Sequence, residues 1–236
     1  MPGRPQSRQG RPRVKAVVFD LDGTLVDSAG DLQAAANRLM RQNGLPELDL
    51  ATVTCFIGNG IARLVERCFA HSGSLPDDLP DQVARFKLYY AAEEHRRTGF
   101  MPGAETALRR LAASDMALGL CTNKDTQPAR AILNRLRIEG LFRAVVGGDS
   151  GLAQKPDASP LLACVALCGV PPAEAVYVGD SATDAATAEV AGLPFLLYTE
   201  GYRRGPLVTM KHAAAFSHFA NLPNVIRGLP HAHPAD

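Results

Sequence analysis

Features typical of membrane or secreted proteins are missing from these 236 residues. No apolar run approaches the roughly 18 residues of a membrane-spanning helix, so we expect no such helix. The N-terminal segment has no apolar core and therefore does not resemble a secretory signal. The cysteines include no CxxC pair, and their odd number without a disulfide framework fits a reducing compartment. The sequence thus predicts a cytoplasmic protein.

A strong charge of either sign is missing as well. The net charge is +1, so no overall basic field indicates a nucleic-acid partner. Residues 1–13 are locally basic, and such a segment can serve as an arm for nucleic acid or membranes. No aromatic or apolar residue lies between its arginines, which favours a solvated, disordered tail. We expect no nucleic-acid or membrane partner, and a second flexible tail at 229–236.

Short apolar runs recur along the rest of the chain, each followed by a turn residue or an acid. They are too short for independent helices, so we interpret them as buried parallel strands. The predicted strands are 14–19, 116–121, 144–149, 175–180 and 194–199. Helical patterns lie between them, over 104–111, 126–138 and 158–168. This alternation predicts an α/β fold with a doubly wound, mostly parallel, Rossmann-like sheet.

The interval 29–99 breaks the alternation, because it holds helical patterns and no convincing strand. Ser28 and Asp31 resemble a capping box at the start of the first of these helices. A crossover between parallel strands needs only about a dozen residues, so the interval is long enough to be a domain. We predict a core of residues 14–28 and 100–228, and an inserted all-helical cap, 29–99, hinged over the strand ends.

Polar residues follow the predicted strands at the point where each strand ends. In open α/β sheets, ligands bind outside the carboxyl ends of the strands, so these residues are expected to converge. In chain order they are Asp20, Asp22, Thr122, Asn123, Lys155, Asp180 and Asp184.

Four carboxylates cannot share one site unaided. A like-charge pair near 4 Å costs about 4 kcal/mol at an effective dielectric constant of 20, and Lys155 supplies only one positive charge. A hard divalent cation supplies two more, and Mg²⁺ typically takes one or two carboxylates plus a substrate phosphate. The amides after Gly23 and the Thr122 hydroxyl then remain free for phosphate oxygens. This combination indicates a phosphoryl-transfer site.

Four motifs in the chain resemble those of the haloacid dehalogenase superfamily of aspartate-nucleophile phosphatases. They are DLDGT at 20–24, TN at 122–123, Lys155, and GDSATD at 179–184, and they occur in the order of that superfamily. The resemblance spans residues 14 to 226. It implies a Mg²⁺-dependent phosphatase that acts on a small phosphorylated substrate.

The resemblance also implies a role for each matching residue. Asp20 would attack phosphorus and become an aspartyl phosphate, while Asp22 would act first as acid and then as base. The implied phosphate ligands are Thr122, Asn123, Lys155 and Gly23. The implied metal ligands are Asp20, the backbone carbonyl of Asp22, and Asp180, with Asp184 close behind.

The cap segment 56–69 bears on the substrate. Gly58 and Gly60 open a predicted helix whose free amides suit an anion, although glycine turns also serve as hinges. The IGNG sequence here, together with DLDGTLVDSAGDL, TNK and GGDSGLAQKP, resembles the bacterial phosphoglycolate phosphatases, which convert 2-phosphoglycolate to glycolate. Our hypothesis is that the turn from Asn59 to Arg63 binds the substrate carboxylate. The candidate specificity residues are therefore Gly58, Asn59, Gly60 and Arg63.

The sequence departs from that family in its arginines. Arg63, Arg203 and Arg204 stand where less charged residues are usual, and any of them could meet a carboxylate or simply face solvent. Another small organophosphate therefore stays open as substrate: a phosphosugar, a nucleotide or pyrophosphate.

Three other functions share part of this pattern. A phosphosugar mutase shares the motifs but keeps the aspartyl phosphate for transfer. A receiver domain also has clustered acids, but its acid pair lies on another strand than the phospho-acceptor, and it lacks an inserted cap. An inactive scaffold of the same fold would be expected to have lost Asp20, Asp22 or Lys155. Either a monomer or a homodimer is compatible with the sequence.

Overall fold

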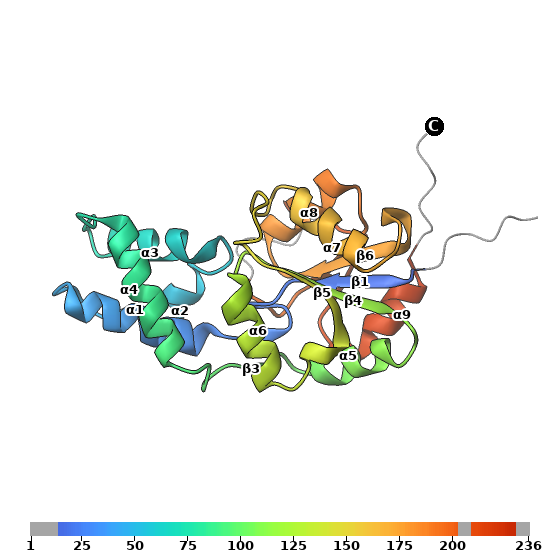
Figure 1. The fold of residues 1–236 in the computed structure, drawn as a ribbon, viewed down its shortest axis with the longest axis horizontal. Helices are drawn as coiled ribbons and strands as arrows, with labels where there is room; N and C mark the ends of the chain where they lie inside the picture. The colour runs from blue at the N-terminus through green and yellow to red at the C-terminus, as the bar shows by residue number, and fades with distance from the viewer. Residues whose placement is uncertain (1–13, 203–208, 230–236) are drawn as a thin grey trace, which may run out of the picture.

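The chain forms a core built on a parallel sheet and a smaller helical cap beside it (Figure 1). The structure, a computed structural model, describes residues 14–202 and 209–229. The predicted tail at 1–13 lies outside the described residues, as does the C-terminal tail from residue 230 onward. Leu229, the first residue of that predicted tail, is buried in the core, so packing reaches one residue further than predicted.

The core sheet has the strand order β5-β4-β1-β6-β7-β8, and all of its pairings are parallel. The strands are β1 (Ala16–Phe19), β4 (Ala117–Cys121), β5 (Phe142–Val146), β6 (Ala175–Gly179), β7 (Phe195–Tyr198) and β8 (Ala214–Phe216). The five predicted strands correspond to the first five of these, which confirms the fold class. β8 was not predicted, because it has only three residues and two of them are alanines, which have a low preference for strands.

Helices cover both faces of this sheet. They are α5 (Ala104–Ala112), α6 (Thr126–Arg135), α7 (Ser159–Leu167), α8 (Ala182–Ala191) and α9 (Leu222–Arg227). Val17 and Phe19 face a cluster formed with α5, α6 and α9, whereas Ala16 and Val18 face a cluster formed with α7 and α8. Alternate residues of β1 are thus buried on opposite faces, as a doubly wound sheet requires.

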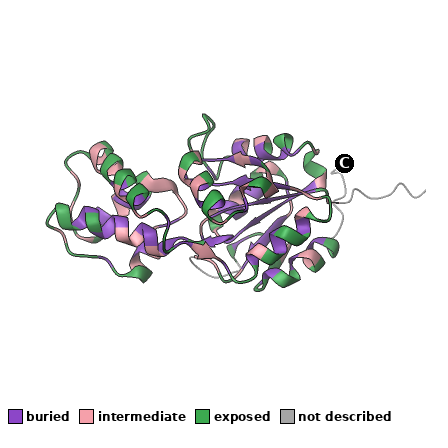
Figure 2. Cartoon of the chain, turned by 60° about the horizontal axis from the view of Figure 1, so that its bottom comes forward, coloured by how far each residue is buried: buried purple, intermediate pink, exposed green. Residues whose placement is uncertain are grey.

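The cap has a small core of its own. Its helices are α1 (Ala29–Gln42), α2 (Leu50–Thr54), α3 (Gly60–His71) and α4 (Leu79–Ala92). Their inward faces form a separate hydrophobic cluster that includes Leu39, Val65 and Phe86, and Figure 2 shows a buried interior in each part of the molecule. The chain enters and leaves the cap through β2 (Val26–Asp27), which pairs antiparallel with β3 (Gly99–Phe100). Each strand is only two residues long, which leaves no periodicity to detect in the sequence.

The expected capping box at the start of α1 is not formed. The Ser28 hydroxyl donates instead to Asp22 at 2.5 Å, and its side chain caps no helix amide. The amides of Ser28 and Ala29 donate to the Tyr202 hydroxyl, at 2.8 and 3.0 Å. The first turn of α1 is therefore held by a residue far along the chain, which local sequence cannot indicate.

Asp31 joins the two ends of the cap. It is fully buried and accepts hydrogen bonds from the Arg97 amide at 3.0 Å and the Thr98 hydroxyl at 2.6 Å. Buried carboxylates are retained in proteins when such donors satisfy them. The connections into and out of the cap are thus fastened to each other.

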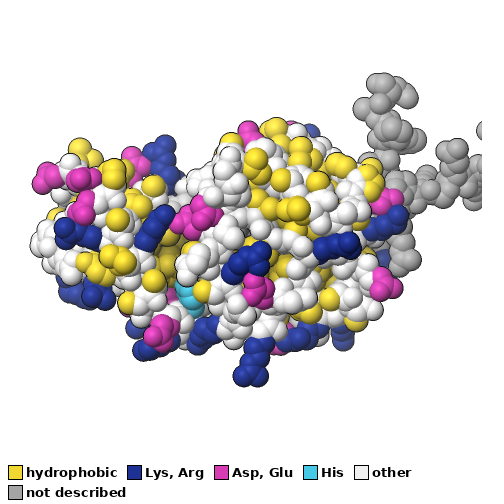
Figure 3. Space-filling view, viewed as in Figure 1, with side chains coloured by type: hydrophobic (Ala, Val, Ile, Leu, Met, Phe, Trp, Pro, Cys, Tyr) yellow, Lys and Arg dark blue, Asp and Glu magenta, His cyan; other side chains and the backbone are white. Residues whose placement is uncertain are grey.

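On the face seen in Figure 3, basic and acidic side chains are interspersed, in keeping with the small net charge. Among the described residues, no helix combines the length and the apolar composition that crossing a bilayer requires.

Replacing Asp31 with alanine is expected to destabilise the protein by about 1–3 kcal/mol, because the Arg97 amide and the buried Thr98 hydroxyl lose their acceptor. Urea unfolding of both proteins measures this difference. Asp77→Ala, at an exposed position before α4, is the control and should leave the midpoint unchanged. Equal midpoints for Asp31→Ala and the wild type would contradict the prediction.

Candidate active site

The predicted site residues meet where the core sheet faces the cap. Asp20 follows β1, which lies between β4 and β6 in the sheet. Asp20 and Asp22 line two cavities whose walls include Ile57 and Gly58 of the cap, and the larger cavity has a volume of about 150 Å³. The site therefore lies between cap and core.

Lys155 joins the first and last motifs. Its Nζ donates to Asp20 Oδ1 at 2.8 Å, to Asp184 Oδ1 at 2.6 Å and to the Tyr177 hydroxyl at 2.9 Å. All four side chains are buried. Because an ammonium group has three donor hydrogens, this set of partners saturates it.

Burial and charge set the ionisation of these groups. Burial raises the pKa of Asp20 to about 6, although Lys155 opposes the shift. Burial also acts to raise the pKa of Asp184, but Lys155 outweighs it and the net shift is downward. For Lys155, burial acts to lower the pKa, and Asp184 and Asp20 more than reverse this effect. Lys155 and Asp184 thus form the charged pair, and Asp20 is the carboxylate whose negative charge Lys155 does not fully offset against burial.

Asp180 lies beside this group and depends on two neutral donors. The Thr24 hydroxyl donates to Asp180 Oδ1 at 2.7 Å, and the Tyr202 amide donates to Oδ2 at 2.7 Å. Burial, followed by the charges of Asp184 and Asp20, raises the pKa of Asp180 well above its usual range. When Asp180 is ionised, the cluster therefore has more negative charge than the neighbouring cation balances.

The three carboxylates are arranged in a way that fits a metal ion. Asp20, Asp180 and Asp184 each offer an oxygen, and these oxygens lie within 4.8 Å of one another. Glycines keep the space around them open: a Cβ atom on Gly179 would lie 2.6 Å from Asp184 Cβ, and one on Gly23 would lie 2.7 Å from Asp180 Oδ2. An all-oxygen donor set with excess negative charge suits a hard divalent cation.

Asp22 forms an ion pair with Lys124, a residue that the sequence analysis did not single out. Lys124 Nζ donates to both carboxylate oxygens of Asp22, at 3.0 and 2.9 Å, while Ser28 Oγ donates to Oδ1. Lys124 is buried, and its Nζ lies 4.9 Å from the centre of the Tyr90 ring in α4. Lys124 is the third residue of the TNK triplet and directly follows the TN motif at 122–123.

Thr122 and Asn123 differ in how they contribute. Thr122 is buried and lines the smaller cavity with Asp20 and Asp22. Asn123 accepts from the Lys155 amide at 2.9 Å and donates to the Lys155 carbonyl at 3.1 Å and the Gly58 carbonyl at 3.3 Å. Its side chain thus fixes the main chain at Lys155 and reaches the cap.

Comparisons with known proteins agree with this geometry. Residues 17–198 match the family model described as haloacid dehalogenase-like hydrolase. A phosphoglycolate phosphatase of Cereibacter sphaeroides is 45% identical over 215 residues, which cover 90% of this chain and 98% of that protein. One from Rhodospirillum rubrum is 42% identical over 214 residues, covering 88% and 89%. A crystal structure from Haemophilus somnus, described as a predicted phosphoglycolate phosphatase, has a TM-score of 0.85 at 30% identity, covering 90% and 97%.

The chain belongs to the haloacid dehalogenase-like hydrolase family. The recognition made from the four sequence motifs is confirmed, and the protein is an enzyme of the phosphatase type within that family.

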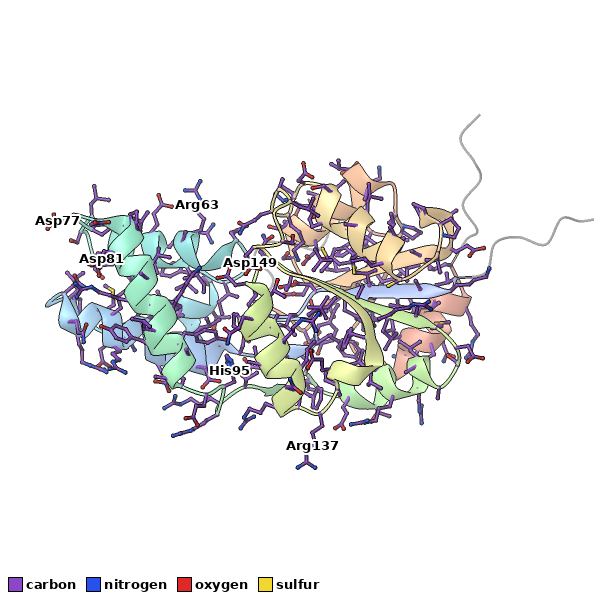
Figure 4. The ribbon with its side chains drawn as sticks, in the orientation of Figure 1. Arg63, Asp77, Asp81, His95, Arg137 and Asp149 are labelled. Atoms are coloured by element: carbon purple, nitrogen blue, oxygen red, sulfur yellow. The ribbon has the colours of Figure 1, made fainter. Side chains whose placement is uncertain are left out.

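The cap of this phosphatase brings some of the predicted specificity residues to the site and leaves another outside. Gly58 lines both cavities, Gly60 lines the smaller one and Asn59 lines the larger one. Arg63 lines neither: its side chain is 65% exposed, pairs with Glu66 at 2.6 Å and points outward from the cap in Figure 4. Arg203 and Arg204 lie outside the described residues.

Arg67 holds the cap loop in place, a role that the sequence did not indicate. It donates to the Phe56 carbonyl at 3.0 Å and to Asn59 Oδ1 at 2.9 Å. Asn59 in turn donates to the Thr183 hydroxyl of α8 at 3.0 Å. The loop at 56–60 is therefore bonded to α3 on one side and to the core on the other.

Replacing Lys155 with methionine is expected to lower the free energy of unfolding by about 3–5 kcal/mol, because Asp20 and Asp184 would be left buried without their cation. Denaturant unfolding without added metal measures it. Lys15→Met is the matched control, since Lys15 is largely exposed and pairs with Glu174 at the surface, so little change is expected. A similar small change in both variants would refute a structural role for Lys155.

Proposed function

We propose that this enzyme hydrolyses 2-phosphoglycolate to glycolate and phosphate with the help of Mg²⁺. The observation that carries the proposal is the buried Asp20, bonded to Lys155 and adjacent to Asp180 and Asp184, with Asp22 two residues away beneath the cap. Relatives named phosphoglycolate phosphatase that match nearly the full chain support the choice of substrate.

In the proposed reaction the two aspartates divide the chemistry. An oxygen of Asp20 forms a bond to phosphorus as the bond from phosphorus to the glycolate oxygen breaks, and Asp22 gives that oxygen a proton. Water then attacks the aspartyl phosphate, Asp22 takes the proton of the water, and the bond between phosphorus and Asp20 breaks. Thr122, which lines the smaller cavity, binds a phosphoryl oxygen, and Lys155, which is bonded to Asp20, offsets the charge of the phosphoryl group.

Charge counting supports a divalent ion. Asp20, Asp22, Asp180 and Asp184 carry four negative charges when ionised, and the buried Lys124 and Lys155 return two. A divalent cation would balance the remainder. The residues that would hold it are Asp20, Asp180 and Asp184, with the backbone carbonyl of Asp22. When bound, the ion supplies Lewis-acid stabilisation of the charge on the phosphoryl group.

The cavity supports a small substrate. Its volume of about 150 Å³ favours a two-carbon ester over a hexose phosphate in this position of the cap. Gly58 and Asn59 belong to its cap wall, Gly60 lines the smaller cavity, and we propose that this loop limits substrate size. We also propose a cytoplasmic location, because all five cysteines are free thiols, as is usual in a reducing compartment.

The test of the proposed function is phosphate release from 2-phosphoglycolate beside phosphosugars, nucleoside monophosphates, pyrophosphate and phosphoserine. We expect kcat/KM to favour 2-phosphoglycolate by tenfold or more, about 1.4 kcal/mol. Asp20→Asn, which keeps the size but removes the nucleophile, should show no turnover. A preference for another ester would retain the phosphatase and reject phosphoglycolate, and an active Asp20→Asn variant would reject the nucleophile.

Metal binding has a test that does not depend on activity. Mg²⁺ at 100 times its dissociation constant should stabilise the folded protein by about 2.7 kcal/mol, measured as a rise in Tm. Asp180→Asn should lose most of this rise, because it removes one of the three converging carboxylates. Asp149→Asn is the control: its carboxylate accepts from Thr126 and lines neither cavity, so its response should match the wild type. An undiminished rise in Asp180→Asn would exclude Asp180 as a ligand.

A further inference from the structure

The proposed substrate has a second anionic group, the carboxylate, which has no partner in the site so far described. Lys155 and Thr122 serve the phosphoryl end. The sequence suggested Arg63 for the other end, but Arg63 lines neither cavity and pairs with Glu66 at the surface. A different cation is therefore needed, and the inference that follows rests on the proposed function.

Lys124 is in the right place. It lines the smaller of the two cavities that share Asp20 and Asp22, and within residues 14–202 and 209–229 no other basic residue lines either cavity. It is buried, and its ammonium group lies 2.9 and 3.0 Å from the two oxygens of Asp22. A buried cation that faces a substrate cavity is a stronger anion partner than an exposed one, because water screens it less.

The chemistry of the substrate brings its carboxylate to this lysine. Asp22 must contact the oxygen that links phosphorus to the glycolate carbon, because this is the oxygen that it protonates. In 2-phosphoglycolate the carboxylate is bonded to that same carbon. A pose that places the linking oxygen on Asp22 therefore places the carboxylate beside the cation that Asp22 already contacts. Lys124 gives two of its three donor hydrogens to Asp22, and its positive charge also attracts an anion in the cavity.

A cap residue, Tyr90, restricts the position of the Lys124 side chain. Tyr90 of α4 is buried, and its ring centre lies 4.9 Å from Lys124 Nζ, close enough for a cation–π contact. Asp22 contacts the same ammonium group from the core. Lys124 is therefore confined between Asp22 and the cap, with little freedom to turn away from the cavity. We propose that Lys124 binds the carboxylate of the substrate and so selects 2-phosphoglycolate among small phosphate esters.

The test compares two esters that differ only at this group: 2-phosphoglycolate and 2-phosphoglycolamide, in which a neutral carboxamide replaces the carboxylate. We expect the wild type to favour the carboxylate by at least tenfold in kcat/KM. Lys124→Met should bring the two esters within twofold of each other, chiefly by raising KM for 2-phosphoglycolate. Lys124→Arg, which keeps the charge, should restore part of the preference.

Lys87→Met is the matched control. Lys87 also bridges cap and core, through an ion pair with Asp125 at 2.6 Å, but lines neither cavity that contains Asp20. Its loss should leave the preference for the carboxylate unchanged. If Lys124 served only to position Asp22, Lys124→Met would slow both esters by the same factor and keep the preference, and this result would overturn the proposal. If Lys124→Met does not fold, Lys124→Gln takes its place under the same criteria.

The two proposals fail in different ways. A wild type that prefers a phosphosugar or a nucleotide to both esters refutes the proposed function. The inference about Lys124 is decided separately, by the ratio of the carboxylate to the carboxamide ester in the wild type and in Lys124→Met. A wild type that does not distinguish these two esters overturns it.

Discussion

The contact between Lys155 and the carboxylates of Asp20 and Asp184 is the constraint on which the rest of the site depends. It joins the loop after β1 to the start of α8 through a residue that belongs to neither. Burying these charges is tolerable only because each has a partner at hydrogen-bond distance. Asn123, after β4, fixes the main chain at Lys155, so residues from three neighbouring strands converge on Lys155. The parallel order β4-β1-β6 is what makes this convergence possible.

A second lysine changes how the charges are shared. If Lys155 were the only cation, four ionised carboxylates would leave most of their negative charge for an external cation to balance. Lys124 forms an ion pair with Asp22 and balances its charge. The charges of Asp180 and Asp20 are then the negative charges that a metal would balance. The site is therefore divided in two. In the proposed reaction, the half around Lys155 holds the phosphoryl group. The half around Lys124 contains the proposed acid–base residue Asp22 and lies next to the cap residue Tyr90.

The sequence was sufficient where local patterns decide the structure. Buried parallel strands such as β1 and β6 are apolar runs that end in an acid, and four motifs at such ends identified the reaction and the family. It was insufficient where distant contacts decide. Ser28 has the form of a helix cap, yet it bonds to Asp22 because the Tyr202 hydroxyl takes its place at α1. Arg63 has the charge of a carboxylate ligand, yet the orientation of α3 turns it to solvent. Nothing in spacing alone distinguishes Lys124 from Arg63.

The segments that connect the cap to the core share residues with the candidate site. Ser28, the last residue before α1, donates to the proposed acid–base group Asp22. Tyr202 donates its amide to Asp180, while its hydroxyl accepts from the amides that begin α1. Asp31 then ties α1 to the returning segment at Thr98. A rotation of the cap about β2 and β3 would therefore have to stretch contacts to Asp22 and Asp180. The position of the cap and the geometry of these two carboxylates are therefore linked by direct hydrogen bonds. Because the cap is inserted immediately after the first motif, a movement of the cap would displace both the loop at 56–60 and the proposed acid–base group Asp22.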